Sequence, residues 1–170
     1  MATITIKGNP VHTLGGLPPV GSQLKDFTLV SNNFSRVNLK EFSGNRLVLN
    51  IFPSLDTGTC AASVRAFNKM AAGLENTKVL CISRDLPFAQ ARFCGAEGIE
   101  NAITLSDYET GAFGRDYNLM MTDGPLAFLL SRSVIVADAD GRIIYTQQVT
   151  EVSEEPNYDK VTESLNLSGF

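Results

Sequence analysis

Hydrophobic and polar residues alternate at the start of the chain and then give way to longer apolar runs. The opening segment TITIKGNPVHTL (3–14) contains two short alternating stretches that meet at Gly8 and Asn9. A period of two is typical of half-buried β-strands, and glycine beside asparagine is typical of a tight turn. We therefore expect a β-hairpin over residues 1–14, followed by a connection rich in Gly and Pro at 15–21.

Three apolar runs predict strands that are buried on both faces of a sheet. They are RLVLNIF (46–52), KVLCIS (78–83) and AITL (102–105). A later stretch, residues 133–149, contains two apolar runs separated by Asp140 and Gly141, which predicts a second hairpin. The segments DFTLV (26–30) and VNLKEF (37–42) are too short to assign.

Helical periodicity begins at Cys60. From there, apolar residues recur at three- and four-residue spacing as far as Leu74, which predicts an amphipathic helix of about four turns. Pro at the start marks two further helices, 87–98 and 156–167, and a short one is expected at 109–116. This order predicts one α/β domain over residues 1–170, with a mixed central sheet flanked by helices on both faces. It is compatible with a thioredoxin-like core.

Composition narrows the function classes. Among the 170 residues, 44% are hydrophobic and 19% are charged, as expected for a soluble globular protein. The net charge is −4 and no run of Lys and Arg occurs, which argues against nucleic-acid and anionic-membrane partners. No segment has the features of a signal peptide or approaches the roughly 18 apolar residues of a membrane helix. We therefore expect a cytoplasmic protein.

Cys60 closes the segment PSLDTGTC (53–60), where the candidate chemistry lies. It falls at the start of a predicted helix, where unpaired backbone N–H groups and the helix dipole favour an anion such as a thiolate. We expect Thr57 to bring its side-chain oxygen near the Cys60 sulfur. We expect Pro53 to shield this sulfur within a small pocket. These residues alone leave a reactive and an inert Cys60 equally open. Cys81, inside an apolar strand, is expected to be inert.

Other cysteine chemistries fit poorly. A cysteine hydrolase needs a base, and the only histidine is His12, which we interpret as a surface residue of the hairpin. A zinc site or a dithiol motif needs closely spaced cysteines, whereas Cys60, Cys81 and Cys94 are separated by 21 (81 − 60) and 13 (94 − 81) positions. Attack of a thiolate on a peroxide O–O bond, which yields a sulfenic acid, fits and needs no metal or cofactor.

The segment NIFPSLDTGTCAASVRAFN (50–68) resembles the active-site segment of the peroxiredoxins, because Pro53, Thr57 and Cys60 match their Pro-x-x-x-Thr-x-x-Cys motif. VLCISRDLPFAQARFCGAEG (79–98) and TDGPLAFLLSRSVIVAD (122–138) are similar to one branch of that family, the bacterial thiol peroxidases. The similarity covers nearly the whole chain. It implies a thioredoxin-like fold and the reduction of hydrogen peroxide and alkyl hydroperoxides.

The resemblance also implies roles for individual residues. Cys60 would be the peroxidatic thiol, with Thr57 and Arg132 holding the thiolate and the peroxide oxygens. Arg65 is five residues from Cys60, about 140° around the helix axis, and is expected to be a surface charge. Cys94 would resolve the Cys60 sulfenic acid into an intramolecular disulfide. The family further implies thioredoxin as the reductant, no bound cofactor and a homodimer.

The implied disulfide imposes a geometric demand, because its two Cα atoms must lie within about 7 Å. Cys60 and Cys94 are expected on separate helices, so we expect both helix ends to unwind locally, helped by Gly58 and Gly95. Two alternatives stay open at this point. In the first alternative to a peroxidase, the chain is a peroxide-sensing redox switch or interaction module on the same fold. In the second, it is a thioredoxin-fold binding protein with inert thiols.

Overall fold

A computed structural model describes residues 1–167 of the chain. Strands β1 (Thr3–Ile6) and β2 (Asn9–His12) form an antiparallel pair, as predicted for the N-terminal segment. The turn is at Lys7 and Gly8, both with positive φ, and not at Gly8 and Asn9 as expected. The shift by one residue follows from the register, because Asn9 pairs with Ile6 and so already belongs to the second strand.

The main sheet has seven strands in the spatial order β4-β3-β7-β6-β5-β8-β9. They are β3 (Thr28–Ser31), β4 (Arg36–Asn38), β5 (Arg46–Ile51), β6 (Thr77–Ser83), β7 (Ala102–Ser106), β8 (Ser133–Ala137) and β9 (Ile143–Gln148). The central strands β5, β6 and β7 are parallel, and β3 and β8 run antiparallel to them. The predicted mixed sheet is therefore confirmed, and the two segments left unassigned supply its β3-β4 edge.

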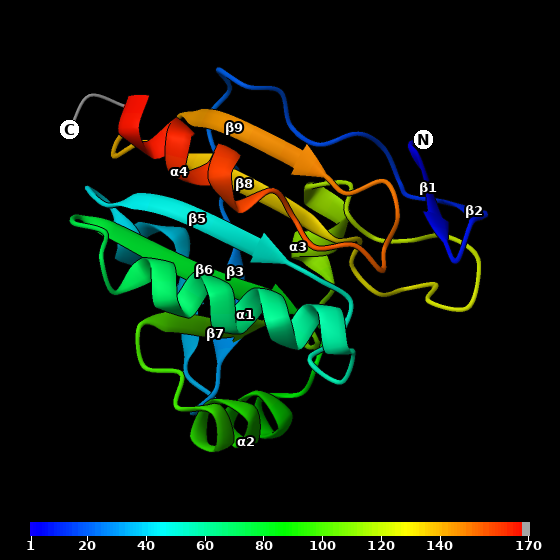
Figure 1. Cartoon of the computed structure of the whole chain (residues 1–170), viewed down its shortest axis with the longest axis horizontal. Coiled ribbons are helices and arrows are strands. Elements are labelled where there is room, and N and C mark those ends of the chain that lie inside the picture. Colours follow the sequence, from blue (N-terminus) through cyan, green and yellow to red (C-terminus); the bar gives the residue numbers. More distant parts are fainter. Residues whose placement is uncertain (168–170) are drawn as a thin grey trace.

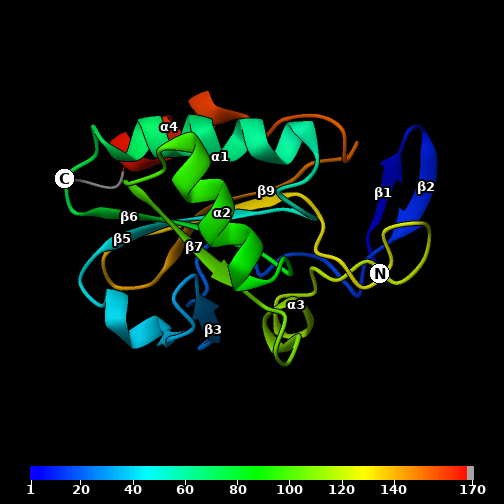
Figure 2. The same ribbon diagram turned by 90° about the horizontal axis from the view of Figure 1, so that it is seen from below.

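Helices cover both faces of this sheet. They are α1 (Gly58–Ala71), α2 (Pro87–Glu97), α3 (Ala112–Asp116), α4 (Tyr158–Leu167) and the short 3₁₀ helix η1 (Leu39–Phe42). Helices α1, α2 and α4 lie on one side of the sheet, and α3 and η1 lie on the other (Figure 2). The assignment of residues 1–170 to one domain stays a prediction, and its last three residues lie outside the described part.

The side chains of β5 alternate between the two faces of the sheet, and the strand leads directly into the turn before α1. Leu47, Leu49 and Ile51 point into the core on the α3 side, whereas Val48 and Phe52 belong to the core beneath α1. The chain then leaves the carboxyl end of β5 through a short turn and enters α1 (Figure 1). Because β5 and β6 are parallel, the loops that follow them meet at the same edge of the sheet.

The N-terminal hairpin lies beside this edge and has a small apolar core of its own. Its buried members are Ile4, Val11, Met121 and Val152. Figure 1 shows the hairpin set to one side of the main sheet, with the segment between β9 and α4 running out toward it. Within residues 1–167, no helix has both the length and the apolar character needed to cross a membrane.

Candidate active site

Cys60 lies in the first turn of α1, as the sequence predicted. Thr57 is the N-cap residue, with an extended backbone, and its Oγ1 accepts a hydrogen bond from the backbone N–H of Cys60 at 3.2 Å. A threonine at this position satisfies one of the free N–H groups at the start of a helix. Thr57 therefore fixes the turn that carries the thiol, although the hydrogen bond goes to the Cys60 backbone and not to its sulfur.

Arg132 provides a cation beside the thiol. Its Nη2 donates to Sγ of Cys60 at 3.1 Å, and its Nε donates to the carbonyl oxygen of Val152 at 2.9 Å. Strand pairing explains the contact, because Ser133 of β8 pairs with Ile51 of β5 and so places Arg132 level with the turn that leads into α1. The contact sets a fixed positive charge directly beside the sulfur.

The guanidinium of Arg132 keeps one free donor. Arg132 is only 1% exposed, and its Nη1 is buried without a hydrogen bond to any of residues 1–167. Buried polar groups are nearly always hydrogen-bonded, so an unpaired donor at this position is a candidate contact for an incoming oxygen atom.

The sulfur is more enclosed than the sequence predicted. We expected the loop to form a small pocket around it, but Cys60 has 0% exposure and belongs to an apolar cluster with Phe52, Leu55 and Val64. Pro53 is buried in the turn before α1. The Cys60 side chain is therefore enclosed by its neighbours.

Asp85 supports the loop that precedes α1. Its carboxylate accepts hydrogen bonds from Ser54 Oγ at 2.7 Å, from the Leu55 N–H at 2.8 Å and from Ser83 Oγ at 2.7 Å. Asp85 lies between β6 and α2, so these contacts tie the Cys60 loop to the entry of the helix that carries Cys94. The sequence analysis missed this residue, and its only signal was an acidic residue two positions after a buried strand.

Asn50 is hydrogen-bonded to the first turn of α1 through Ser63. Its Nδ2 donates to Ser63 Oγ at 3.2 Å, and Ser63 Oγ donates to the carbonyl oxygen of Cys60 at 2.8 Å. Both side chains are fully buried. The signal for Asn50 in the sequence was a single polar residue within the apolar stretch LVLNIF (47–52).

The other two cysteines have different surroundings. Cys81 is fully buried in β6, and this burial raises the pKa of its thiol to about 12, as fits the inert role predicted for it. Cys94 is half-buried on α2, with its Sγ 3.6 Å from Thr104 Oγ1 of β7. All three cysteines are free thiols. Cys60 and Cys94 thus lie on separate helices, as predicted, and their pairing stays a prediction.

His12 and Arg65 lie outside the Cys60 site. His12 Nδ1 is 2.6 Å from Asp123 Oδ2 at the hairpin, and Arg65 forms a surface ion pair with Glu97 at 3.4 Å. Both interpretations made from the sequence are therefore right. In the described part of the chain, no group of three or more His, Cys, Asp or Glu side chains is placed to hold a metal ion.

Comparisons with known proteins point to one family. The Redoxin family matches residues 19–162. A thiol peroxidase of Corynebacterium glutamicum is 53% identical over 166 residues, which covers 98% of this chain and all of that protein. The crystal structure of a peroxiredoxin-like protein from Aquifex aeolicus is 34% identical, with a TM-score of 0.91 over 97% of this chain and 96% of its own.

A thiol peroxidase structure from Chromobacterium violaceum shares the fold at 22% identity, with a TM-score of 0.90 over 97% of this chain and 95% of its own. The family match and the 53% identity to a thiol peroxidase thus define a thiol-based redox protein, and the fold is thioredoxin-like. The chain belongs to the Redoxin family. The resemblance to the thiol peroxidases and the predicted fold are both confirmed.

Proposed function

We propose that this protein is a thiol-dependent peroxidase that reduces hydrogen peroxide and alkyl hydroperoxides, with Cys60 as the reacting thiol. The observation that carries the proposal is the 3.1 Å contact between Arg132 Nη2 and Cys60 Sγ in the first turn of a helix. Membership of the Redoxin family and 53% identity to a thiol peroxidase support the same activity.

The first chemical step is a two-electron oxidation of Cys60. Its thiolate attacks one peroxide oxygen, an S–O bond forms, the O–O bond breaks, and the departing oxygen takes a proton from water. The products are a sulfenic acid and water or an alcohol. Arg132 stabilises the thiolate, and its free Nη1 is placed to stabilise the negative charge on the departing oxygen. Thr57 holds the turn that presents the sulfur.

The second step joins the two helices. The Cys94 thiol attacks the Cys60 sulfenic sulfur, water leaves, and a Cys60–Cys94 disulfide forms. Helix α2 ends at Glu97, and Gly98 caps it in a left-handed conformation, with its backbone N–H donating to the Cys94 carbonyl oxygen. This last turn must unwind for Cys94 to approach Cys60. A dithiol of the thioredoxin type then reduces the disulfide and restores both thiols.

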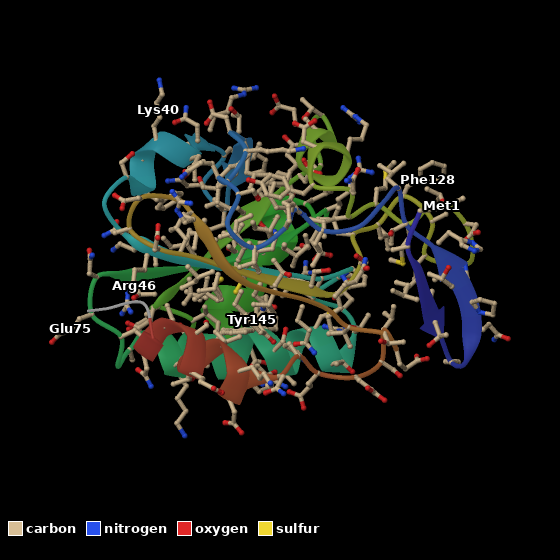
Figure 3. The ribbon with its side chains drawn as sticks, turned by 90° about the horizontal axis from the view of Figure 1, so that it is seen from above. Met1, Lys40, Arg46, Glu75, Phe128 and Tyr145 are labelled. Carbon is tan, nitrogen blue, oxygen red and sulfur yellow. The ribbon has the colours of Figure 1, made fainter. Side chains whose placement is uncertain are left out.

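We also propose that the protein is a homodimer and works in the cytoplasm. Three large apolar side chains at one region of the surface support a self-association site: Leu86, Phe88 and Phe128 are 53%, 69% and 64% exposed. Arg84 links them, because it precedes Leu86 and donates to the Phe128 carbonyl oxygen. Phe128 lies at the periphery of the molecule (Figure 3). A disulfide that is reduced in every cycle requires a reducing compartment.

A coupled assay of peroxide-dependent thioredoxin oxidation tests the activity. We expect Cys60→Ser to abolish turnover, with Cys81→Ser as the matched control that retains it. Normal turnover by Cys60→Ser would refute the proposal. A wild-type protein that forms the disulfide but consumes peroxide only once would instead favour the redox switch.

A further inference from the structure

The N-terminal hairpin is joined by backbone hydrogen bonds to the segment 150–153, which links β9 to α4. The Thr5 N–H donates to the Thr150 carbonyl oxygen at 2.7 Å, and the Val152 N–H donates to the Thr5 carbonyl oxygen at 2.9 Å. The Val152 side chain is buried in the small apolar core of the hairpin. The hairpin and this segment therefore form one unit.

Glu151 is the polar centre of that unit. Its carboxylate accepts hydrogen bonds from Thr5 Oγ1, from the N–H groups of Lys7 and Gly8 at 2.9 and 3.1 Å, and from Ser153 Oγ at 2.9 Å. These bonds, with that from Thr5 the largest contribution, lower the pKa of Glu151 from about 4.5 to about 2. One carboxylate thus binds the turn of the hairpin and its own segment together.

The same segment holds two parts of the active site. The Val152 carbonyl oxygen accepts the Nε–H of Arg132 at 2.9 Å, and this guanidinium contacts the Cys60 sulfur. The Ser153 carbonyl oxygen accepts the hydroxyl of Thr59, in the first turn of α1, at 3.0 Å. Two consecutive carbonyl groups next to Glu151 therefore orient the cation and the helix turn that surround the thiol.

We propose that Glu151 is a positioning residue for the peroxidase reaction. By fixing the hairpin turn against segment 150–153, it sets the Val152 carbonyl that directs Arg132 at Cys60. The inference rests on the proposed function of Cys60. The hairpin would thereby act on the chemistry through a continuous path of contacts. The hairpin turn contacts Glu151, the neighbouring Val152 carbonyl contacts Arg132, and Arg132 contacts the Cys60 sulfur.

The path can be tested with Glu151→Gln, which keeps the size of the side chain and removes its charge. The matched control is Glu154→Gln, because the Glu154 side chain is exposed and forms no hydrogen bond or ion pair with a described residue. Thr5→Val, which removes only one of the hydrogen bonds to Glu151, serves as a milder second variant. The second-order rate constant with hydrogen peroxide is measured for each variant between pH 5 and 8.

We expect the rate constant at pH 7 to fall about five- to tenfold in Glu151→Gln, and the acid limb of its pH profile to move to higher pH. Thr5→Val should show a smaller change in the same direction, and Glu154→Gln none. Identical rates and pH profiles for Glu151→Gln and Glu154→Gln would overturn the inference, even if Glu151→Gln melts at a lower temperature. A Cys60→Ser variant that reacts like the wild type would instead refute the proposed function.

Discussion

Arg132 and Cys60 are 72 residues apart in the chain, yet Nη2 of the first lies 3.1 Å from Sγ of the second. Their proximity follows from the antiparallel pairing of β5 and β8, which sets Arg132 beside the turn that begins α1. The sheet register therefore determines whether this thiol has a cation next to it. A shift of β8 by one residue would turn Arg132 to the opposite face of the sheet.

The loop before α1 depends on the Asp85 carboxylate. Asp85→Asn keeps the shape of the side chain but places an amide group opposite donors such as the Leu55 N–H. We expect a loss of about 1–3 kcal/mol in the free energy of unfolding, together with a slower reaction of Cys60 with peroxide. Urea unfolding and stopped-flow kinetics measure the two effects. A fully stable Asp85→Asn protein with unchanged kinetics would show that the loop needs no such anchor.

Thr57 has a capping role that serine can fill and valine cannot. Because its Oγ1 accepts the Cys60 N–H, Thr57→Val should lower the free energy of unfolding by about 0.5–2 kcal/mol, whereas Thr57→Ser should stay close to the wild type. Denaturant unfolding of the three proteins makes the comparison. A loss for Thr57→Ser without a loss for Thr57→Val would mean that the methyl group, and not the oxygen, matters.

Replacing the three cysteines one at a time should distinguish their roles in turnover. Cys94→Ser should reduce one equivalent of peroxide per chain and then stop in the thioredoxin assay, because no resolving thiol remains. Cys81→Ser should turn over normally, since burial holds the pKa of the Cys81 thiol at about 12 and keeps it protonated at neutral pH. If Cys81→Ser were the variant that stops after one equivalent, Cys81 would be the resolving cysteine.

Attachment of the hairpin should weaken in acid. The pKa of Glu151 is about 2 in the folded chain and near its usual value of about 4.5 in the unfolded one, so folding depresses it. The resulting stabilisation is complete above about pH 4.5 and is lost as the pH falls through about 2. The stability difference between wild type and Glu151→Gln should therefore shrink over this range.

Unfolding in urea at pH 5 and at pH 2.5 measures that difference, with Glu154→Gln as the control. If the stability difference between wild type and Glu151→Gln is the same at pH 5 and at pH 2.5, the charge of Glu151 adds nothing to the attachment of the hairpin.

Local patterns were sufficient to predict most elements of the fold. Apolar runs identified β5, β6 and β7, and the three-to-four spacing after Cys60 identified α1, because both signals arise within a few residues. Strand β4 at the edge of the sheet and its neighbour β3 were left unassigned, since three or four residues carry too little periodicity. The hairpin turn was misplaced by one residue because glycine tolerates either turn position.

The sequence predicted those residues of the site whose side chains form a motif. It did not predict contacts made by backbone atoms. The Pro53, Thr57 and Cys60 pattern was visible in one short segment, and Arg132 was reached through the family resemblance alone. The Val152 carbonyl has no sequence signal, because every residue has one and only its position in the fold gives it a role. Full enclosure of the Cys60 sulfur was also missed, since it depends on packing between distant segments.

The most direct test of the account is the rate at which hydrogen peroxide oxidises each cysteine, followed by mass spectrometry in the wild type, Arg132→Met and Arg65→Gln. We predict that Cys60 is oxidised first, that Arg132→Met slows this step on the order of 10- to 100-fold, and that Arg65→Gln leaves it unchanged. Oxidation that begins at Cys94 or Cys81, or a Cys60 rate that does not depend on Arg132, would contradict the account.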